Sequence, residues 1–350
     1  MNKIVEEDTQ KIIDLNINWA KLKNRNVLVT GATGMIGQYI VFTILELNKL
    51  YNYNINVFAL CRNESKAEQV FKDEIENKLL KFILQDVEQE INLDITFDYI
   101  IHTASPANPR FYSTNPVGTI MANTIGTRNT LELARKCEAV YCYISTMEVY
   151  GQMDIDSGIK EEDYGAINSL DLRSCYPESK KLGENMCVAY KEQYGLNVKI
   201  IRPAYTYGPG MSIEDPRVQC DFMKKVINGE DIIMKSDGSM KRTYTYVADV
   251  ISGIFFAILN GEDIVYNVAN EDAIISIRGL AQTIISSKEN SESKLIMEIQ
   301  EGKGWSKIKP KIMNCDKLKL LGWIPLIKVE EGIKRTMNYH IDTKKENRNG

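Results

Sequence analysis

A tyrosine and a lysine four residues apart are the side chains of this sequence best suited to acid–base chemistry. On a helix, Tyr176 and Lys180 would lie on one face, one turn apart. The Lys180 ammonium is expected to stabilise a phenolate and to lower the pKa of Tyr176 toward neutrality. Such a phenolate can take a proton from a hydroxyl while the hydride on the same carbon leaves for a nicotinamide. Thr146, at the end of the preceding predicted strand, can hydrogen-bond the same oxygen.

A glycine cluster at residues 30–37 (TGATGMIG) follows an apolar run and opens a stretch with helical spacing. Gly31 can make the tight turn, Gly34 lets the backbone approach a pyrophosphate, and Gly37 lets the helix pack closely on the strand. The helix N-terminus would add N–H donors and the positive end of its dipole. The pattern predicts a dinucleotide site, although a glycine-rich turn without a ligand has the same letters.

The residues after the second predicted strand bear on which nicotinamide cofactor binds. An acid at this place binds the ribose hydroxyls of NAD, whereas an arginine accommodates the 2′-phosphate of NADP. The sequence has Cys61-Arg62-Asn63 and no carboxylate there, so Arg62 favours NADP over NAD unless it is a solvated loop arginine. Asp86, at the end of the third predicted strand, is a candidate adenine contact or a turn former.

The elements that must position these residues alternate between strand-like and helix-like segments up to about residue 205. This alternation predicts an α/β fold: a Rossmann-type, doubly wound parallel sheet with helices on both faces. The predicted strands span 26–30, 54–61, 81–87, 98–104, 139–146 and 197–204, and the predicted helices 35–50, 64–80, 115–137 and 174–194. Beyond residue 205 the alternation is less regular, which predicts a smaller C-terminal lobe, although 263–270 could return a strand to the main sheet.

The composition excludes several classes of partner. The net charge of −4 favours neither nucleic acid nor an anionic membrane as a partner. No apolar run is long enough to span a bilayer, and the acidic N-terminal residues lack a signal-peptide core, so we expect a cytoplasmic protein. The seven cysteines form no C-x-x-C pair and there are only two histidines, so we expect reduced thiols and no metal site.

These motifs together resemble the extended short-chain dehydrogenase/reductase superfamily, in particular its nucleotide-sugar epimerases and dehydratases. The resemblance covers about residues 24–335. It rests on Thr30–Gly37, Asp86, His102–Pro106, Asn123–Thr127, Ser145–Gly151, the pair of Tyr176 and Lys180, Arg202–Pro203, Tyr207–Gly210, Arg242–Asp249 and Leu321–Trp323.

The resemblance implies a tightly held nicotinamide cofactor, NAD or NADP, and a triad of Thr146, Tyr176 and Lys180. It assigns cofactor contacts to Gly31, Thr33, Gly34, Met35, Ile36, Gly37, Arg62, Asp86, Val87, Thr103, Ala104, Ser105, Asn123, Tyr176, Lys180 and Pro203. It assigns substrate contacts to Pro106, Arg110, Met147, Glu148, Tyr205, Arg217 and Arg242.

The same resemblance divides the chain into domains. It implies an NAD(P)-binding Rossmann domain at 24–204, with a return of 243–275, and a nucleotide-sugar-binding lobe at 205–242 and 276–340. Residues 1–23 are expected to be an amphipathic leader without chemistry, and 341–350 a frayed tail. A homodimer through the helices at about 115–137 and 174–194 is implied as well.

Within this group the sequence is most similar to UDP-glucuronate decarboxylases. The shared stretches are Ser105–Ala107, Asn115–Pro116, Arg173–Tyr176, Tyr207–Pro209 and Asp215–Val218. The implied reaction oxidises C4 of a hexuronic acid to a β-keto acid, which loses carbon dioxide before the hydride returns. In the related dehydration, oxidation of a neutral hexose at C4 acidifies the C5 proton, and water leaves from C6.

Two residues depart from the pattern of this group. Met147 stands where the decarboxylases carry serine and the 4,6-dehydratases carry an aspartic acid that protonates the leaving hydroxyl, and methionine can do neither. Glu148 remains as a base at C5 or on a water, or as a strand-end carboxylate that bonds to backbone. Tyr205 stands where relatives usually have asparagine and should reshape the sugar pocket.

The arginines of the expected substrate site have more than one interpretation. Arg217 and Arg242 are expected to grip the substrate diphosphate, because guanidinium groups match phosphate oxygens, although each could form a surface ion pair. Arg110 could pair with a C6 carboxylate or have a structural or phosphate-binding role.

Four functions follow from these residues. The first is a nucleotide-sugar lyase, decarboxylase or dehydratase, that works through a transient 4-keto sugar. The others are a C4 or C5 epimerase, a net NADP-dependent keto-sugar reductase, and a non-catalytic dinucleotide-binding sensor, against which the intact triad counts. Fold alone does not separate them.

Overall fold

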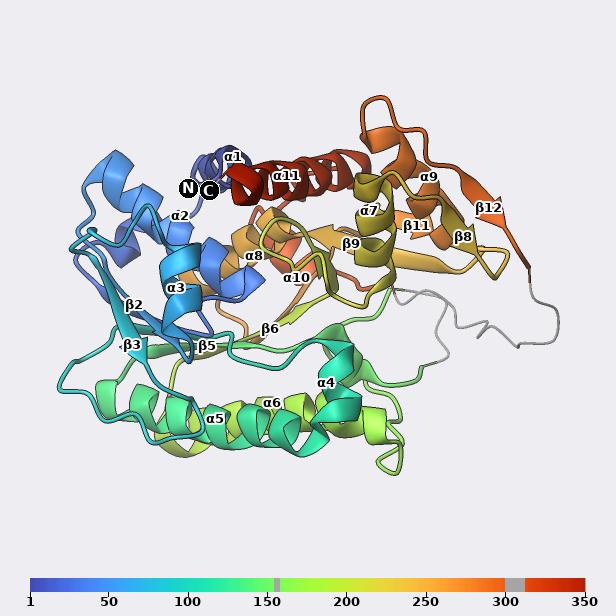
Figure 1. The fold of residues 1–350 in the computed structure, drawn as a ribbon. Coiled ribbons are helices and arrows are strands. Elements are labelled where there is room, and N and C mark those ends of the chain that lie inside the picture. The colour runs from blue at the N-terminus through green and yellow to red at the C-terminus, as the bar shows by residue number, and fades with distance from the viewer. Residues whose placement is uncertain (154–157, 300–311, 350) are drawn as a thin grey trace.

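The computed structural model describes residues 1–153, 158–299 and 312–349, and its central layer is a seven-stranded sheet (Figure 1). All strands are parallel, in the order β10-β6-β5-β4-β1-β2-β3. They are β1 (Asn26–Thr30), β2 (Asn56–Cys61), β3 (Leu80–Leu84), β4 (Tyr99–His102), β5 (Val140–Ile144), β6 (Val198–Pro203) and β10 (Val265–Val268). The predicted doubly wound parallel sheet is confirmed, and the strand expected within 263–270 is β10, which pairs with β6.

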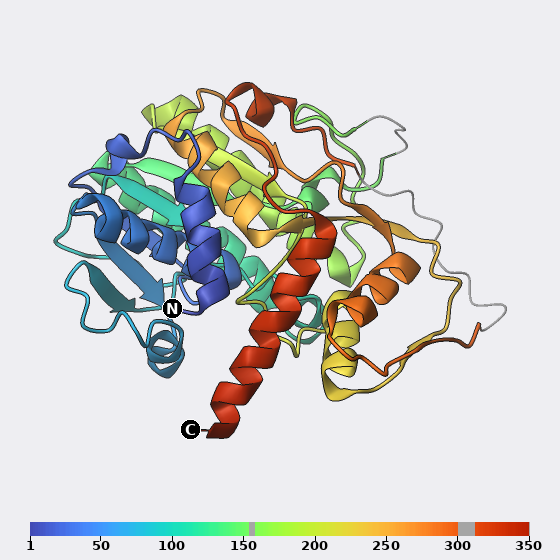
Figure 2. The ribbon, with the colours of Figure 1, turned by 90° about the horizontal axis from the view of Figure 1, so that it is seen from above.

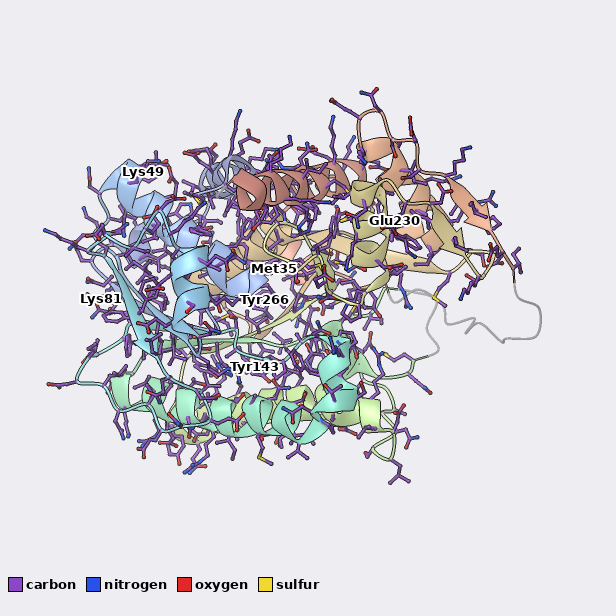
Figure 3. All side chains as sticks on the ribbon, in the orientation of Figure 1. Met35, Lys49, Lys81, Tyr143, Glu230 and Tyr266 are labelled. Carbon is purple, nitrogen blue, oxygen red and sulfur yellow. The ribbon has the colours of Figure 1, made fainter. Side chains whose placement is uncertain are left out.

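Helices cover both faces of the sheet (Figure 1). One face carries α2 (Met35–Tyr51), α8 (Val247–Leu259) and α1 (Lys3–Ile13), and the other carries α5 (Pro116–Cys137) and α6 (Cys175–Tyr194). Strand β1 shows why: Val27 and Val29 are buried in the core on the α2 side, and Leu28 is buried on the α5 side. Successive side chains of a strand point to opposite faces, so an apolar run requires cover on both. Figure 3 shows Tyr143 between the sheet and the α5–α6 layer.

The winding of the chain reverses direction at β1, which pairs with both β2 and β4. The loops that follow β1 and β4 therefore run to opposite faces of the sheet and leave a crevice at the carboxyl ends of the strands. This is where ligands bind in open α/β sheets, and it places the glycine turn and residues 103–109 on either side of one opening.

The remaining elements form a smaller region beside the sheet (Figure 1). It contains a three-stranded sheet, a two-stranded sheet and several helices. These are β7 (Tyr205–Tyr207), β9 (Lys241–Tyr246) and β11 (Ile274–Ser276); β8 (Ile232–Met234) and β12 (Leu295–Met297); and α7 (Val218–Asn228), α9 (Ile277–Ser287), α10 (Asp316–Leu320) and α11 (Val329–Asn349). Residues 300–311 of the expected lobe, and Gly350, lie outside the described residues.

Two expectations about individual segments need correction, and a third segment is now placed. The helix expected at 64–80 ends early, as α3 (Glu64–Val70), and the chain continues in turns, in which the Glu74 amide donates to the Phe71 carbonyl and the Asn77 amide to the Glu74 carbonyl. The segment expected to fray at 341–350 is helical as far as Asn349, as part of α11. Residues 1–23, expected to be an amphipathic leader, pack on the main domain: Val5 and Trp19 are buried in the main core, and Figure 2 shows α1 beside α2.

None of the helices in the described part of the chain is long and apolar enough to span a membrane. Across the same residues, no group of three or more histidine, cysteine, aspartate or glutamate side chains is arranged to hold a metal ion.

Candidate active site

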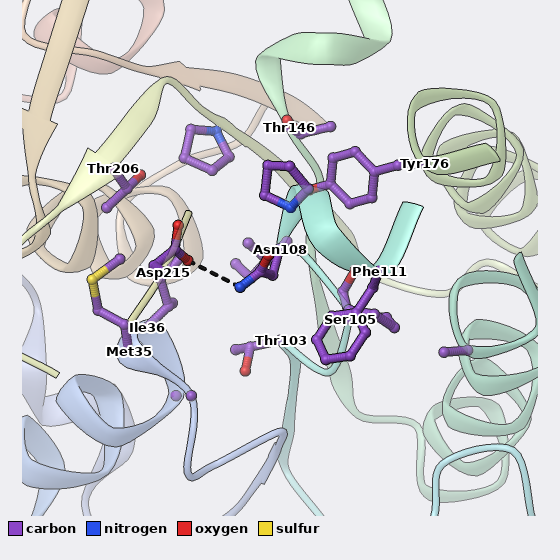
Figure 4. Close-up of a pocket in the computed structure, with 18 of the residues that line it drawn as sticks. Met35, Ile36, Thr103, Ser105, Asn108, Phe111, Thr146, Tyr176, Thr206 and Asp215 are labelled. Carbon is purple, nitrogen blue, oxygen red and sulfur yellow. Dashed lines mark hydrogen bonds between the residues drawn. The ribbon is translucent and has the colours of Figure 1, made fainter. Parts of the chain in front are cut away.

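A cavity of about 490 Å³ opens at the carboxyl ends of β1, β4, β5 and β6, and Figure 4 shows part of its wall. A second hollow of about 260 Å³ continues from it toward Arg62 and Asp86, and the two share the wall residues Thr33, Gly34 and Thr103. Together they form one elongated site in the predicted crevice. All predicted site residues line it except Asn123, Arg110 and Arg242.

The glycine turn has a geometry that only glycine permits. Gly31 has a φ of +65°, and a Cβ added there would lie 2.7 Å from the Cα of Ala104. A Cβ on Gly37 would lie 2.4 Å from the carbonyl oxygen of Gly31. Gly34 is the N-cap of α2 and supplies no side-chain acceptor, so the amides of the first turn face the site without a side-chain partner. The turn therefore fits a dinucleotide pyrophosphate.

The far end of the site carries the residues expected near the adenosine. Arg62 Nη1 lies 3.2 Å from Asp86 Oδ2, while Asp86 Oδ1 accepts a hydrogen bond from the Glu88 amide. Asp86 is thus a turn former and an ion-pair partner of Arg62 at once. Lys66, which the sequence did not single out, lines the same end from α3.

The loop after β4 is held in place by partly or fully buried hydrogen bonds. Thr103 Oγ1 donates to the carbonyl of Thr30 at 2.7 Å. Ser105 Oγ donates to Asn123 Oδ1 at 2.8 Å, and Asn123 Nδ2 donates to Ser179 Oγ at 3.0 Å. Asn123 is fully buried and does not line the cavity, so it orients Ser105 instead of forming part of the wall.

The three residues of the expected triad line the same cavity, and Figure 4 shows Thr146 and Tyr176 in its wall. Tyr176 and Lys180 lie on the first turns of α6, and Thr146 is the second residue after β5 (Val140–Ile144). Lys180 is 2% exposed; its Nζ donates to the carbonyl of Ile144 at 2.7 Å and lies 4.7 Å from the ring centre of Tyr143.

The electrostatics of the triad differ from the expectation. Burial raises the pKa of Tyr176, and the negative charge of Glu148 raises it further; a hydrogen bond with Thr146 and the charge of Arg217 act in the other direction. Burial also lowers the pKa of Lys180 to about 7, against the charge of Glu184. The expected lowering of the Tyr176 pKa by Lys180 is therefore not found, because the cost of burying a phenolate dominates.

Glu148 and Met147 form the wall next to Tyr176, on the short helix η2 (Met147–Tyr150). Glu148 Oε1 lies 3.4 Å from Arg173 Nη2, so the carboxylate has an ionic partner and is not simply bonded to backbone. Met147 is buried and presents an apolar surface to the cavity.

Tyr112 is a wall residue that no sequence motif indicates. It is buried on α4 (Pro109–Thr114), and its ring stacks on Tyr176 with centroids 4.7 Å apart at 15°. The guanidinium of Arg173 lies 6.0 Å from the ring centre of Tyr112. Arg173 itself belongs to a stretch shared with the decarboxylases, so its position in the motif was a usable signal.

The three expected substrate arginines have different surroundings. Arg217 lines the cavity and forms a two-pronged ion pair with Asp215, at 2.8 and 2.9 Å. Asn108 Nδ2 donates to the same carboxylate at 3.3 Å (Figure 4). Arg242 lies behind the wall, its guanidinium 5.3 Å from the ring centre of the wall residue Tyr205. Arg110 is exposed and outside the wall.

Comparison with known proteins agrees with this geometry. The model of a protein family described as "NAD dependent epimerase/dehydratase family" matches residues 27–269. UDP-glucuronic acid decarboxylase 1 of Xenopus tropicalis is 31% identical over 317 residues, which are 90% of this chain and 72% of that protein. UDP-glucuronic acid decarboxylase 6 of Arabidopsis thaliana is 31% identical over 311 residues, 89% of this chain and 87% of that one.

The fold also matches solved structures. A crystal structure of UDP-glucuronic acid 4-epimerase from Bacillus cereus, in complex with UDP-glucuronic acid and NAD, superposes with a TM-score of 0.73 at 22% identity. The match covers 91% of this chain and 99% of that one.

Proposed function

Because this chain belongs to the NAD dependent epimerase/dehydratase family and is an enzyme of it, we propose that it is a nucleotide-sugar lyase that decarboxylates UDP-glucuronate through a transient 4-keto sugar. The observation that carries this proposal is the convergence of Thr146, Tyr176, Lys180 and Glu148 in one cavity that continues into the glycine turn. The curated decarboxylases that match most of the chain support this choice of reaction. The complete triad in one cavity counts against a non-catalytic dinucleotide-binding sensor.

Tyr176 is the base in this proposal. Its phenolate takes the proton from the C4 hydroxyl, and Thr146 stabilises the phenolate by a hydrogen bond. A bound oxidised nicotinamide would accept the C4 hydride. Since burial raises the pKa of Tyr176, the phenolate depends on the groups that lower this pKa, which are the hydrogen bond of Thr146 and the charge of Arg217. The Lys180 ammonium donates a hydrogen bond to the Ile144 carbonyl, which holds the lysine side chain at the end of β5 in the site.

Glu148 and Arg217 are the proposed substrate residues of the wall. Glu148 is positioned to orient the sugar or a water beside C5, and its pairing with Arg173 keeps the carboxylate in place. Arg217 would contact the diphosphate by exchanging part of its pairing with Asp215 for phosphate oxygens. Arg242 would support the same contact from behind Tyr205.

NAD is the proposed cofactor. The family is described as NAD dependent, and the Bacillus cereus neighbour was solved with NAD. Arg62 and Lys66 at the adenosine end, with no carboxylate among residues 61–63, keep NADP as the alternative cofactor. A net reductase that releases NADP stays an alternative with it. Mass spectrometry of the cofactor freed by denaturation distinguishes the two.

The reaction is tested by product analysis. The protein is incubated with UDP-glucuronate, and separately with dTDP-glucose and UDP-N-acetylglucosamine. Loss of carbon dioxide from UDP-glucuronate, detected by mass spectrometry, is the expected result. Loss of water from a neutral sugar would identify a dehydratase instead, and turnover of none of the three by the cofactor-loaded protein would contradict the proposal.

Epimerisation at C4 or C5 is the second candidate, and Met147 is the observation that favours it. An apolar side chain supplies neither the serine of decarboxylases nor the acid of dehydratases, whereas epimerisation requires no leaving group at C6. An unchanged product mass with altered NMR coupling constants would identify it.

A contact between Arg110 and the C6 carboxylate remains part of the proposal, although it requires an inward movement of α4. Arg110→Met should then cripple turnover of UDP-glucuronate while leaving UDP binding unchanged. Unaltered turnover would show that Arg110 does not contact the substrate and stays exposed outside the cavity wall, as in the structure.

We further propose a homodimer through α5 and α6. These helices form an outer layer whose exposed face carries apolar side chains, namely Val117, Ile120, Met121 and Ile125 on α5 and Leu182 and Val188 on α6. Apolar residues at this spacing form a stripe suited to a helical partner.

A cytoplasmic location stays a prediction that cell fractionation tests.

A further inference from the structure

The N-terminal helix α1 precedes the part of the chain that the family model matches, and no motif accounts for it. It is nevertheless part of the core. Asn2 caps it by accepting a hydrogen bond from the Ile4 amide, and Val5, Ile12 and Ile13 are buried. Figure 2 shows α1 between α2 and α11.

Asp8 is the unusual residue of this helix, because it is a carboxylate with no exposed surface. Its Oδ2 accepts hydrogen bonds from the hydroxyls of Tyr39 on α2, at 2.9 Å, and Tyr246 on β9, at 2.7 Å. Its Oδ1 accepts from Arg335 on α11, at 3.0 Å from Nε. One carboxylate therefore ties together three elements that are far apart in the sequence.

One of these elements belongs to the cofactor side. Tyr39 lies on the second turn of α2, the helix that begins at the glycine turn. A change in the position of α2 relative to its neighbours would move the turn that is proposed to hold the pyrophosphate.

The other two belong to the substrate side. Tyr246 is the last residue of β9. Its ring centre lies 5.6 Å from the ring centre of Tyr207 on β7. Tyr207 in turn contacts Tyr244, at 5.9 Å, and Tyr244 lies opposite Tyr205 in the strand register. Tyr205 lines the cavity. The contacts of Asp8 thus lead through packed aromatic rings to the wall.

Arg335 reinforces the same connection. Besides Asp8 it pairs with Glu7, at 3.0 Å, and with Glu331, at 3.5 Å, and its helix packs on the two tyrosine strands, since Tyr207 donates to the Val329 carbonyl. Glu7 is exposed, whereas Asp8 is not. Losing Asp8 would leave two buried hydroxyls without an acceptor, which is the costly way to lose a hydrogen bond.

We propose that Asp8 is a positioning residue for substrate binding, which fixes the strands carrying Tyr205 and Arg242 to the helix that begins at the glycine turn. The proposal rests on the proposed function only in taking a uridine nucleotide as the ligand. The proposal gives α1 a role in substrate binding that none of the sequence motifs indicates.

The test compares Asp8→Asn with Glu7→Gln in the full-length, cofactor-loaded protein. The first change removes the buried charge, and the second removes an exposed partner of the same arginine. Calorimetric titration with UDP should show binding weakened about threefold to thirtyfold by Asp8→Asn, a typical coupling between contacting residues. Glu7→Gln should leave the affinity within about twofold of wild type, as expected for an exposed pair. Equal UDP affinity in folded Asp8→Asn, with only a lower melting temperature, would overturn the proposal.

Two further variants keep the test decisive if Asp8→Asn does not fold. Tyr39→Phe breaks only the link to α2, and Tyr246→Phe only the link to β9. Either break should weaken UDP binding, and the double variant should be no weaker than the worse single variant, because one link is being cut twice. Additive effects, or none, would overturn the proposal.

Hydrogen exchange separates this proposal from the proposed function. If wild type binds no UDP, the function proposal fails, but Asp8→Asn must still speed amide exchange in 205–207 and 241–246. Unchanged exchange there would contradict the positioning role by itself.

Discussion

The ionisation of Tyr176 depends on groups from several elements. Its surroundings include a negative charge, a positive charge and two hydroxyls, which come from Glu148, Arg217, Thr146 and Tyr112. Burial dominates and favours the neutral phenol. Activity at neutral pH therefore depends on how the charges in the wall are balanced as well as on the triad itself.

Glu148→Gln tests this balance. Because the charge of Glu148 raises the pKa of Tyr176, removing that charge should lower this pKa and move the acidic limb of hydride transfer to lower pH. The shift should be less than about one pH unit for a pair beside a solvent-open cavity. Absorbance of reduced nicotinamide in single turnovers across a pH series measures it.

Arg173→Gln is the matched opposite change, since it removes the ionic partner of Glu148 and should move the limb to higher pH. Shifts of the same sign in both variants would contradict this description of the wall.

Lys180 links the site to stability. Its pKa is about 7 in the folded protein and 10.5 in a free side chain, so between these values the unfolded chain binds a proton that the folded chain lacks. The free energy of unfolding should therefore rise with pH in this window, by up to about 1.4 kcal/mol per pH unit. Lys180→Met should remove this rise. Urea unfolding at several pH values compares the two proteins, and equal slopes would show that Lys180 is protonated in the fold.

At the scale of elements, the glycine turn depends on contact between its two ends. Gly37→Ala would place a methyl group 2.4 Å from the Gly31 carbonyl oxygen, so α2 must move away from β1. We expect loss of bound cofactor and a decrease of roughly 1–3 kcal/mol in the free energy of unfolding. Cofactor content after denaturation and chemical unfolding measure the two effects.

Gly195→Asn is the control for this change. Gly195 ends α6 with a φ of +69°, has open space around it, and asparagine tolerates that conformation. It should leave cofactor content unchanged. Full cofactor content in Gly37→Ala would mean that the close approach of turn and helix is not required.

Local patterns predicted those elements whose signals are local. Strand β1 and the glycine turn follow from an apolar run and three glycines, and Tyr176 and Lys180 from helical spacing. The helix predicted at 64–80 was wrong beyond Val70, where turns replace it and Phe71 packs between Phe42 and Phe82, a tertiary arrangement that helical spacing does not encode. The stacking of Tyr112 on Tyr176 could not be predicted, since it depends on how α4 packs on α6.

At the scale of the whole molecule, the same limit applies to the N-terminal segment. Its amphipathic pattern was visible in the sequence, but no motif distinguishes Asp8 from the neighbouring acids Glu6 and Glu7. Only the packing of α1 against α2, β9 and α11 removes it from water. The parallel sheet, in contrast, followed from the alternation of elements.

The proposed dimer belongs to this scale as well. Ile125→Asp places a charge in the apolar stripe of α5 and should convert a dimer to a monomer, because an unpaired charge cannot be buried in the interface. Leu320→Asp, on the exposed end of α10, is the control and should leave the mass unchanged. Light scattering coupled to size-exclusion chromatography reads both. A wild-type monomer, or a dimer that persists in Ile125→Asp, would contradict the proposed interface.

The most direct test of the account is the absorbance of the nicotinamide during one turnover. When UDP-glucuronate is mixed with the cofactor-loaded protein, reduced nicotinamide should appear and then decay as carbon dioxide is released. Tyr176→Phe, with the same cofactor content, should give neither signal. Release of carbon dioxide without a transient of reduced nicotinamide, or a normal transient in Tyr176→Phe, would contradict a C4 oxidation that begins at Tyr176.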